Sequence, residues 1–184
     1  FYFLAEKDRL LFRLNETAGV FLPKKIYESL KTGFEDINDI FSGYVSGQLT
    51  DAVIMAVMVS IAMYFLGIRY FIIIGIISGI ANLIPYVGSI AAFILSVSAA
   101  AAQGTPVKAL YAAILIIILQ QIDAMVIVPK LIGSRVKLHP VLVIISLSVF
   151  GSMFGIPGMI IAVPVTAFIK KKFDRIYMKK KFSA

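Results

Sequence analysis

The sequence predicts an all-α, polytopic helical membrane protein with broken or re-entrant helices and an N-terminal amphipathic cytoplasmic helix. Three observations support this class. First, 60% of the 184 residues are hydrophobic and the mean hydropathy is +0.94, whereas a soluble domain is roughly 45–50% apolar. Second, residues 51–169 carry only seven charged side chains. Third, Gly and Pro interrupt the long uncharged stretches, so these stretches cannot all be continuous helices.

Residues 1–49 are more polar than the rest of the chain. Phe1–Ala5 is apolar and does not begin with Met, so we expect it to be the end of a membrane helix truncated upstream. After Pro23, apolar residues recur every three or four positions over 24–45, which predicts one face of an amphipathic helical arm. This arm could lie on the membrane surface or pack on other helices or subunits, and its mixed charge favours packing.

Residues 50–169 form the predicted transmembrane domain. Asp51 stands at the start of its first apolar stretch, where we expect the carboxylate to be stabilised as a helix cap by the helix dipole. Segments of spanning length or slightly less predict membrane helices at about 50–68, 70–84, 87–103 and 107–128.

Residues 140–169 are uncharged, and one continuous helix of this length would reach about 45 Å, against a hydrocarbon core of roughly 30 Å. Their middle, 151–158, is rich in Gly and contains a Pro, which predicts a helical hairpin or re-entrant unit. A hairpin also brings the basic loop 130–139 and the basic tail 170–184 to the same side of the membrane. The positive-inside rule assigns that side, and with it the C-terminus, to the cytoplasm.

Several classes of function are not supported by the sequence. It has no Cys and a single His, so we expect no thiolate or His-rich metal site and no cofactor. It also lacks a phosphate-binding glycine loop and hydrolase motifs, and we therefore predict that it is not an enzyme. The basic tail follows directly on an apolar segment, which favours a cytoplasmic membrane boundary over nucleic-acid binding.

Polar side chains within the apolar segments are the candidates for a transport pathway. Asp123 is the first, because a carboxylate in an apolar span costs roughly 2.5–3.5 kcal/mol and usually faces a cavity or a partner. It could carry a proton or cation, or it could simply pair with Lys130 or Arg135. Gln120 and Gln121 could line the same pathway, although hydrogen bonding between helices is favoured for them.

The second group of candidates lies at the Gly/Pro interruptions, because broken helices expose backbone groups that transporters use to bind substrates. Asn82 could satisfy carbonyl groups freed by Pro85, or it could contact substrate. The alternative is that both interruptions are ordinary bends between packed helices. The remaining candidate pathway residues are Pro85, Gly88, Arg135, His139, Gly155, Pro157 and Gly158.

A set of short motifs, in this order along residues 1–175, resembles the autoinducer-2 exporter family, also called PerM-like permeases. The first, Gly47-Gln48-Leu49, precedes the first full span. The other motifs are Ile84-Pro85-Tyr86-Val87-Gly88, Gln120-Gln121 with Asp123 and Pro129, Leu138-His139-Pro140, Gly155-Ile156-Pro157-Gly158 and Ala162-Val163-Pro164. Two positions depart from the family pattern: Ala124, after Asp123, replaces a frequent Asn, and Lys137, before Leu138, replaces a frequent Gly.

The resemblance implies a longer parent protein with further membrane helices upstream, a bacterial or archaeal cytoplasmic (inner) membrane and a homo-oligomer. It implies export of autoinducer-2 or another small polar solute. Because some relatives are sodium/proton antiporters, a cation/proton antiporter that uses Asp123 is an alternative. A second alternative is a membrane scaffold that transports nothing and recruits partners through the 24–45 arm.

Overall fold

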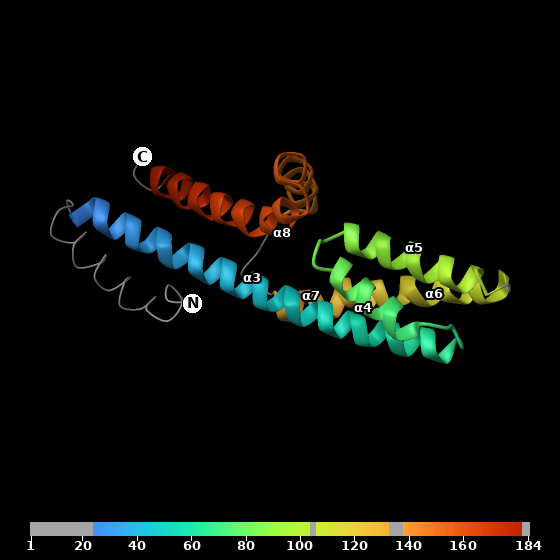
Figure 1. Ribbon diagram of the computed structural model, residues 1–184. Helices are drawn as coiled ribbons and strands as arrows, with labels where there is room; N and C mark the ends of the chain where they lie inside the picture. Colours follow the sequence, from blue (N-terminus) through green and yellow to red (C-terminus); the bar gives the residue numbers. More distant parts are fainter. Residues whose placement is uncertain (1–23, 104–105, 133–137, 182–184) are drawn as a thin grey trace, which may run out of the picture. The chain divides into compact units, whose positions relative to one another are not determined.

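The computed structural model describes residues 24–103, 106–132 and 138–181, and every regular element in these ranges is a helix (Figure 1). The predicted all-α class is therefore confirmed for the described part of the chain. The chain divides into two compact units, residues 1–39 and 40–184. The elements are α3 (Lys24–Phe65), α4 (Phe71–Ala81), α5 (Val87–Ala101), α6 (Pro106–Ile122), η1 (Asp123–Ile127), α7 (Val128–Leu131) and α8 (Pro140–Lys181).

Three helical segments are long and apolar enough to cross a membrane: Lys31–Phe65, Pro106–Leu131 and Pro140–Arg175. Two further helices, α4 and α5, are apolar but shorter. Many large apolar side chains on these helices are exposed, as expected where lipid rather than water is the solvent. These are the properties of a helical membrane protein.

The helix α3 joins two segments that the sequence pattern separates. The predicted arm over 24–45 and the predicted span over 50–68 belong to one continuous helix that ends at Phe65. Asp51 lies in the interior of this helix and is fully buried. The interpretation of Asp51 as a helix cap is therefore wrong, and its carboxyl group needs partners from other elements.

Small residues bring α3 and α4 into close contact. Gly75 and Gly79 are four residues apart and lie on one face of α4. A Cβ atom at Gly75 would collide with Ser60 and with the carbonyl oxygen of Ala56, and one at Gly79 would collide with Ala52 and Ala56. This is small-xxx-small packing, in which the missing side chains let two backbones approach.

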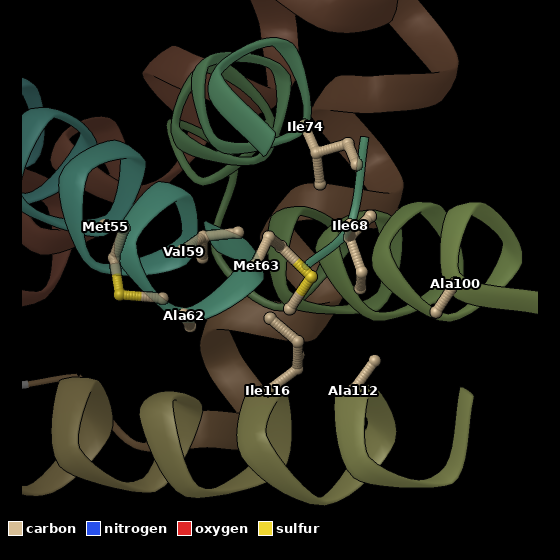
Figure 2. Packing of buried hydrophobic residues seen from close by; sticks show 9 residues of the cluster. All are labelled: Met55, Val59, Ala62, Met63, Ile68, Ile74, Ala100, Ala112 and Ile116. Carbon is tan, nitrogen blue, oxygen red and sulfur yellow. The ribbon is translucent and has the colours of Figure 1, made fainter. Parts of the chain in front are cut away.

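A hydrophobic cluster fills the space between α3, α4, α5 and α6. Figure 2 shows its members, which come from all four helices and from the turn after α3. Two methionines on α3 supply flexible side chains that fit irregular gaps. The buried residues are Met55, Val59, Ala62, Met63, Ile68, Ile74, Ala100, Ala112 and Ile116.

The helix α8 consists of two arms joined at Gly155. The backbone there has φ 62° and ψ −145°, a conformation outside the helical region that suits only glycine. Pro157 follows in the first turn of the second arm, a position that tolerates a missing N–H group. A Cβ atom at Gly158 would collide with the Phe150 carbonyl oxygen, so the two arms press together beside the bend.

We predict that Gly79→Ala destabilises the protein by about 1–3 kcal/mol, because the added methyl group has no space against α3. The measurement is thermal unfolding of the full-length protein in detergent. Gly33→Ala is the matched control, since Gly33 is also helical and no neighbouring atom lies within 4 Å of the position that its methyl group would take. The control should be neutral or slightly stabilising, and equal destabilisation by both variants would contradict the packing argument.

Candidate functional site

A cavity of about 300 Å³ lies within residues 40–184, next to the break between α4 and α5. Side chains from α3, the α4–α5 break, α5, α6, η1, α7 and α8 line it. Apolar residues such as Val128, Val143 and Val163 form part of the wall. The polar lining residues are Tyr44, Gln48, Asp51, Asn82, Tyr86, Ser89, Gln120 and Asp123.

A short chain of hydrogen bonds fixes α3 to the end of α4. The Asn82 side-chain amide donates to Asp51 Oδ2 at 2.8 Å, and the Gln48 side-chain amide donates to the Asn82 carbonyl oxygen at 2.7 Å. All three residues are buried, with exposed fractions of 6% or less. Asn82 thus uses its side chain and its backbone to hold Asp51 and Gln48, which lie about one helical turn apart on α3.

The close approach of α3 to α7 depends on Gly47, the neighbour of Gln48. A Cβ atom on Gly47 would lie 3.1 Å from both the Leu131 carbonyl oxygen and an Ile132 side-chain carbon. The absence of a side chain therefore lets this part of α3 press against the end of α7. The contact places Asp51 on the same cavity as Asp123.

Asp123 begins η1, a five-residue stretch of π-helix. The Val128 N–H group donates to the Asp123 carbonyl oxygen, five residues back. The cause is Pro129, which has no N–H group and whose ring clashes with the preceding turn of an α-helix. The wider turn rotates Asp123 relative to a regular helix, and the side chain is buried, with an exposed fraction of 7%.

The carboxyl groups of Asp51 and Asp123 are close enough to share a hydrogen bond. A carboxylate accepts hydrogen bonds and cannot donate them. A hydrogen bond between the two groups therefore requires a proton on one of them. Lys130, the sequence-predicted alternative partner of Asp123, is exposed, and Asp123 faces Asp51 instead.

The segment between α4 and α5 contains a strained turn at the cavity. Tyr86 has φ 64° and ψ −45°, and the Val87 N–H group donates to the Pro85 carbonyl oxygen at 2.8 Å. This is a γ-turn whose central residue has a positive φ, a rare conformation that costs of order 1–3 kcal/mol. Gly88 completes it, because a Cβ atom there would collide with Ala81 and Asn82.

Two glutamines that line the cavity differ in their roles. The Gln120 side-chain amide donates to the carbonyl oxygen of Ser89 in the first turn of α5, which ties α6 to the far side of the break. Gln48 also donates, but its Oε1 atom receives no hydrogen bond. Backbone carbonyl groups at a helix interruption are thus satisfied by amide side chains from neighbouring helices.

Four buried oxygen atoms on the cavity receive no hydrogen bond from N–H or O–H groups of the described residues. Among the described lining residues none is Lys, Arg or His. The arrangement can accept hydrogen bonds or contact a cation, and it offers no positive charge to an anion. The four atoms are Tyr44 Oη, Gln48 Oε1, Asp51 Oδ1 and Asp123 Oδ1.

The structure brings some of the sequence-predicted pathway residues together and leaves others apart. Asn82, Pro85, Gln120 and Asp123 line the cavity, and Gly88 shapes the turn beside it. Gln121, in contrast, points outward and is exposed.

The other predicted pathway residues are not at the cavity. His139 is exposed, and its Nδ1 atom accepts from the Val141 N–H group at 3.4 Å at the start of α8. Gly155, Pro157 and Gly158 form the bend in α8 and do not line the cavity. Arg135 lies outside the described residues.

Five polar residues of the cavity were missed as site residues from the sequence: Tyr44, Gln48, Asp51, Tyr86 and Ser89. Tyr44 falls on the apolar stripe of the arm, where it resembles a core residue. Gln48 belongs to the Gly47-Gln48-Leu49 motif, so a signal was present. Asp51 could have been found by the rule that singled out Asp123, because both are carboxylates in apolar helical segments.

No group of three or more His, Cys, Asp or Glu side chains that could hold a metal ion occurs in the described ranges. The oxygen atoms of the cavity suit a hard monovalent or divalent cation better than a transition metal. The carboxyl groups of Asp51 and Asp123 provide the only formal negative charges among the described lining residues.

A set of apolar helices around a buried polar cavity is typical of a helical membrane protein. The chain belongs to the AI-2E transporter family: the family model described as "AI-2E family transporter" matches residues 1–178. The family resemblance drawn from the sequence motifs is therefore confirmed.

Curated relatives support this assignment. The chain is 39% identical over 152 residues to "Putative transport protein YueF" of Bacillus subtilis, covering 81% of this chain and 40% of that protein. It is 35% identical over 159 residues to "Putative transport protein YrrI" of the same organism, covering 85% and 44%. It is 29% identical over 140 residues to "Putative permease PerM" of Escherichia coli, covering 74% and 39%. The chain thus spans less than half the length of these relatives, and no solved structure matches it.

We predict that Asn82→Ala lowers the free energy of unfolding by about 1–3 kcal/mol, because it removes the donor that satisfies a buried Asp51 oxygen. Thermal unfolding of the full-length protein in detergent measures the effect. Asn38→Ala is the matched control, since Asn38 is an exposed asparagine of α3. A stability for Asn82→Ala equal to that of the control would show that the Asn82–Asp51 bond contributes nothing.

Proposed function

We propose that this chain forms part of a multi-pass permease that binds a small polar solute in the cavity between α3, the α4–α5 break and η1. The observation that carries the proposal is the set of four buried oxygen atoms without hydrogen-bond donors on one cavity. Buried acceptors without donors are costly, and a bound solute that donates hydrogen bonds would satisfy them. A cavity of about 300 Å³ is at the lower end of the range for small-molecule sites, which supports a small solute.

The lining supports a neutral or cationic solute over an anion. Two carboxyl groups, with no Lys, Arg or His among the described lining residues, repel a negative charge in a low-dielectric setting. A hydroxyl-rich molecule would instead donate to Gln48, Tyr44 and the two aspartates. Export of autoinducer-2, which the family description suggests, is proposed for the parent protein on this basis.

The proposed setting is the cytoplasmic membrane of a bacterium or archaeon, with the C-terminus in the cytoplasm. The basic residues of loop 130–139 and of the tail 170–184 support this orientation through the positive-inside rule. A homo-oligomer and contact with membrane lipid belong to the same proposal.

A second candidate function, cation/proton antiport, is favoured by one specific observation. The carboxyl groups of Asp51 and Asp123 lie close enough to share a hydrogen bond, and two ionised carboxylates at such a distance repel each other unless a proton or a cation lies between them. Exchange of a proton for a cation at this pair would couple their movements. The side-chain oxygens of Gln48 and Tyr44 would then complete the cation's ligands.

The test uses the full-length protein reconstituted in liposomes. Solute efflux and sodium uptake under a pH gradient are measured for the wild type, Asp51→Asn and Asp123→Asn. If either carboxylate contacts the transported species, its replacement should reduce flux by about 10–100-fold, the value of a hydrogen bond to a charged group. Asp39→Asn is the matched control, because Asp39 is an exposed acid of α3, the helix that carries Asp51.

The possible outcomes separate the hypotheses. Sodium flux that both cavity variants abolish supports the antiporter, whereas solute efflux reduced in both without sodium flux supports the solute permease. Flux that survives both replacements would remove the cavity from the mechanism. Absence of any flux in the wild type would contradict both functions and favour a scaffold that recruits partners through the 24–45 arm.

A further inference from the structure

A second concave surface lies at the turn between α3 and α4, away from the polar cavity. It is a groove of about 440 Å³ lined by Tyr64, Gly67, Ile68, Arg69, Tyr70 and Phe71. The turn is compact because Gly67 has φ 64° and Tyr70 has φ 59°, both in the left-handed region. We refer to these six residues as the turn groove.

Two cations meet at the turn groove. Arg69 is exposed within it. Lys108, in the first turn of α6, reaches the same turn: a Cβ atom on Gly67 would lie 3.6 Å from Lys108 Nζ. No acidic residue is among those that line the groove, and neither cation forms an ion pair or hydrogen bond with a described residue.

The distribution of charge along the chain makes this pair unusual. Arg69 and Lys108 are two of the seven charged residues between positions 51 and 169. Lys130, another of the seven, stands at the opposite end of the candidate span Pro106–Leu131 from Lys108, a helical length of about 39 Å for 26 residues. Lys108 and Lys130 therefore stand at opposite ends of this candidate span, and the turn groove lies at the end that carries Lys108.

Aromatic residues surround the two cations, as they do at the level of lipid headgroups. The ring of Tyr64 makes edge contacts with Phe65 and Phe71, with centroid distances of 5.8 and 5.2 Å. Tyr64 and Tyr70 are exposed and offer phenolic hydroxyl groups. Exposed apolar side chains flank the groove residues in sequence: Ile61 lies one helical turn before Tyr64 on α3, and Ile72 follows Phe71 on α4.

We propose that the turn groove binds the phosphate group of an anionic phospholipid, with Arg69 and Lys108 as the charged contacts. Arg suits a phosphate because its planar guanidinium donates two parallel hydrogen bonds, and Lys adds a point charge. The tyrosine hydroxyl groups donate to the remaining headgroup oxygens, and the acyl chains lie against Ile61 and Ile72. A lipid fits better than a free phosphate ion because the helices on both sides of the turn carry exposed apolar side chains. The site goes beyond the transport function and does not depend on it.

The test compares the affinity of full-length protein for phosphatidylglycerol and phosphatidylcholine, measured by native mass spectrometry from mixed detergent–lipid micelles. Each cation near a membrane surface contributes about a five-fold change in affinity for an anionic lipid. Arg69→Gln or Lys108→Gln should therefore weaken phosphatidylglycerol binding about five-fold, and the double variant about 30-fold. Binding of phosphatidylcholine should stay the same. Lys130→Gln is the matched control, because Lys130 is an exposed cation at the opposite end of the span.

Two further measurements separate lipid binding from a loss of stability and from binding of free phosphate. Arg69→Lys retains the charge and loses the paired donors, so it should bind phosphatidylglycerol more tightly than Arg69→Gln even if either variant loses stability. Inorganic phosphate is added as a competitor, and it should displace no lipid. The proposal is overturned if the double variant binds phosphatidylglycerol like the wild type, if Lys130→Gln has an equal effect, or if inorganic phosphate competes at the concentration of the lipid.

Discussion

The hydrogen bonds of Asn82 are the interaction on which the rest of the site depends. Asp51 is fully buried in the middle of α3, where no free backbone N–H group of its own helix is available to it. Its donor is the Asn82 side chain, which can reach it because α4 ends at Ala81. A buried carboxyl group and a broken helix, each costly alone, therefore stabilise each other.

This arrangement requires short distances between backbones, and glycine provides them. The absence of side chains at Gly75 and Gly79 lets α3 and α4 pack closely. Gly88 packs against Ala81 and Asn82 at the break, and Gly47 packs against the end of α7. A side chain at Gly75, Gly79 or Gly88 would force the neighbouring backbone to move, and one at Gly47 would crowd the end of α7. The same residues therefore determine the packing and the geometry of the cavity, and the strain at Tyr86 is held in place by the contacts around it.

The sequence was sufficient to predict the parts of this structure that depend on local pattern. Apolar runs and Gly/Pro interruptions predict the helices, the break at Pro85 and the bend at Gly155, and the cost of a charge in an apolar span identifies Asp123. Asn82 follows from its position beside the break.

The partner of Asp123 could not be predicted in the same way, because pairing between helices leaves no periodic signal. Asp51 lies next to a polar segment, and this position resembles a helix start although α3 continues through it. Gln120 and Gln121 are equivalent in sequence, yet a helix directs neighbouring side chains about 100° apart, so only Gln120 reaches Ser89. Which of the two glutamines faces Ser89 depends on the rotation of α6 about its own axis, and the helices packed against α6 fix that rotation.

The two polar features of the described membrane helices have opposite electrostatic character, and this constrains how the protein can interact with charged molecules. The cavity presents carboxyl and carbonyl oxygens without a cation among its described lining residues, whereas the turn groove presents Arg69 and Lys108 without an acid. The helix α3 contributes to both features, because it carries Asp51 of the cavity and Tyr64 of the turn groove. An anion is therefore attracted to the boundary and repelled from the interior, while a cation experiences the reverse. In the two proposed roles, this separation would let an anionic headgroup bind at the turn groove without competing for the cavity.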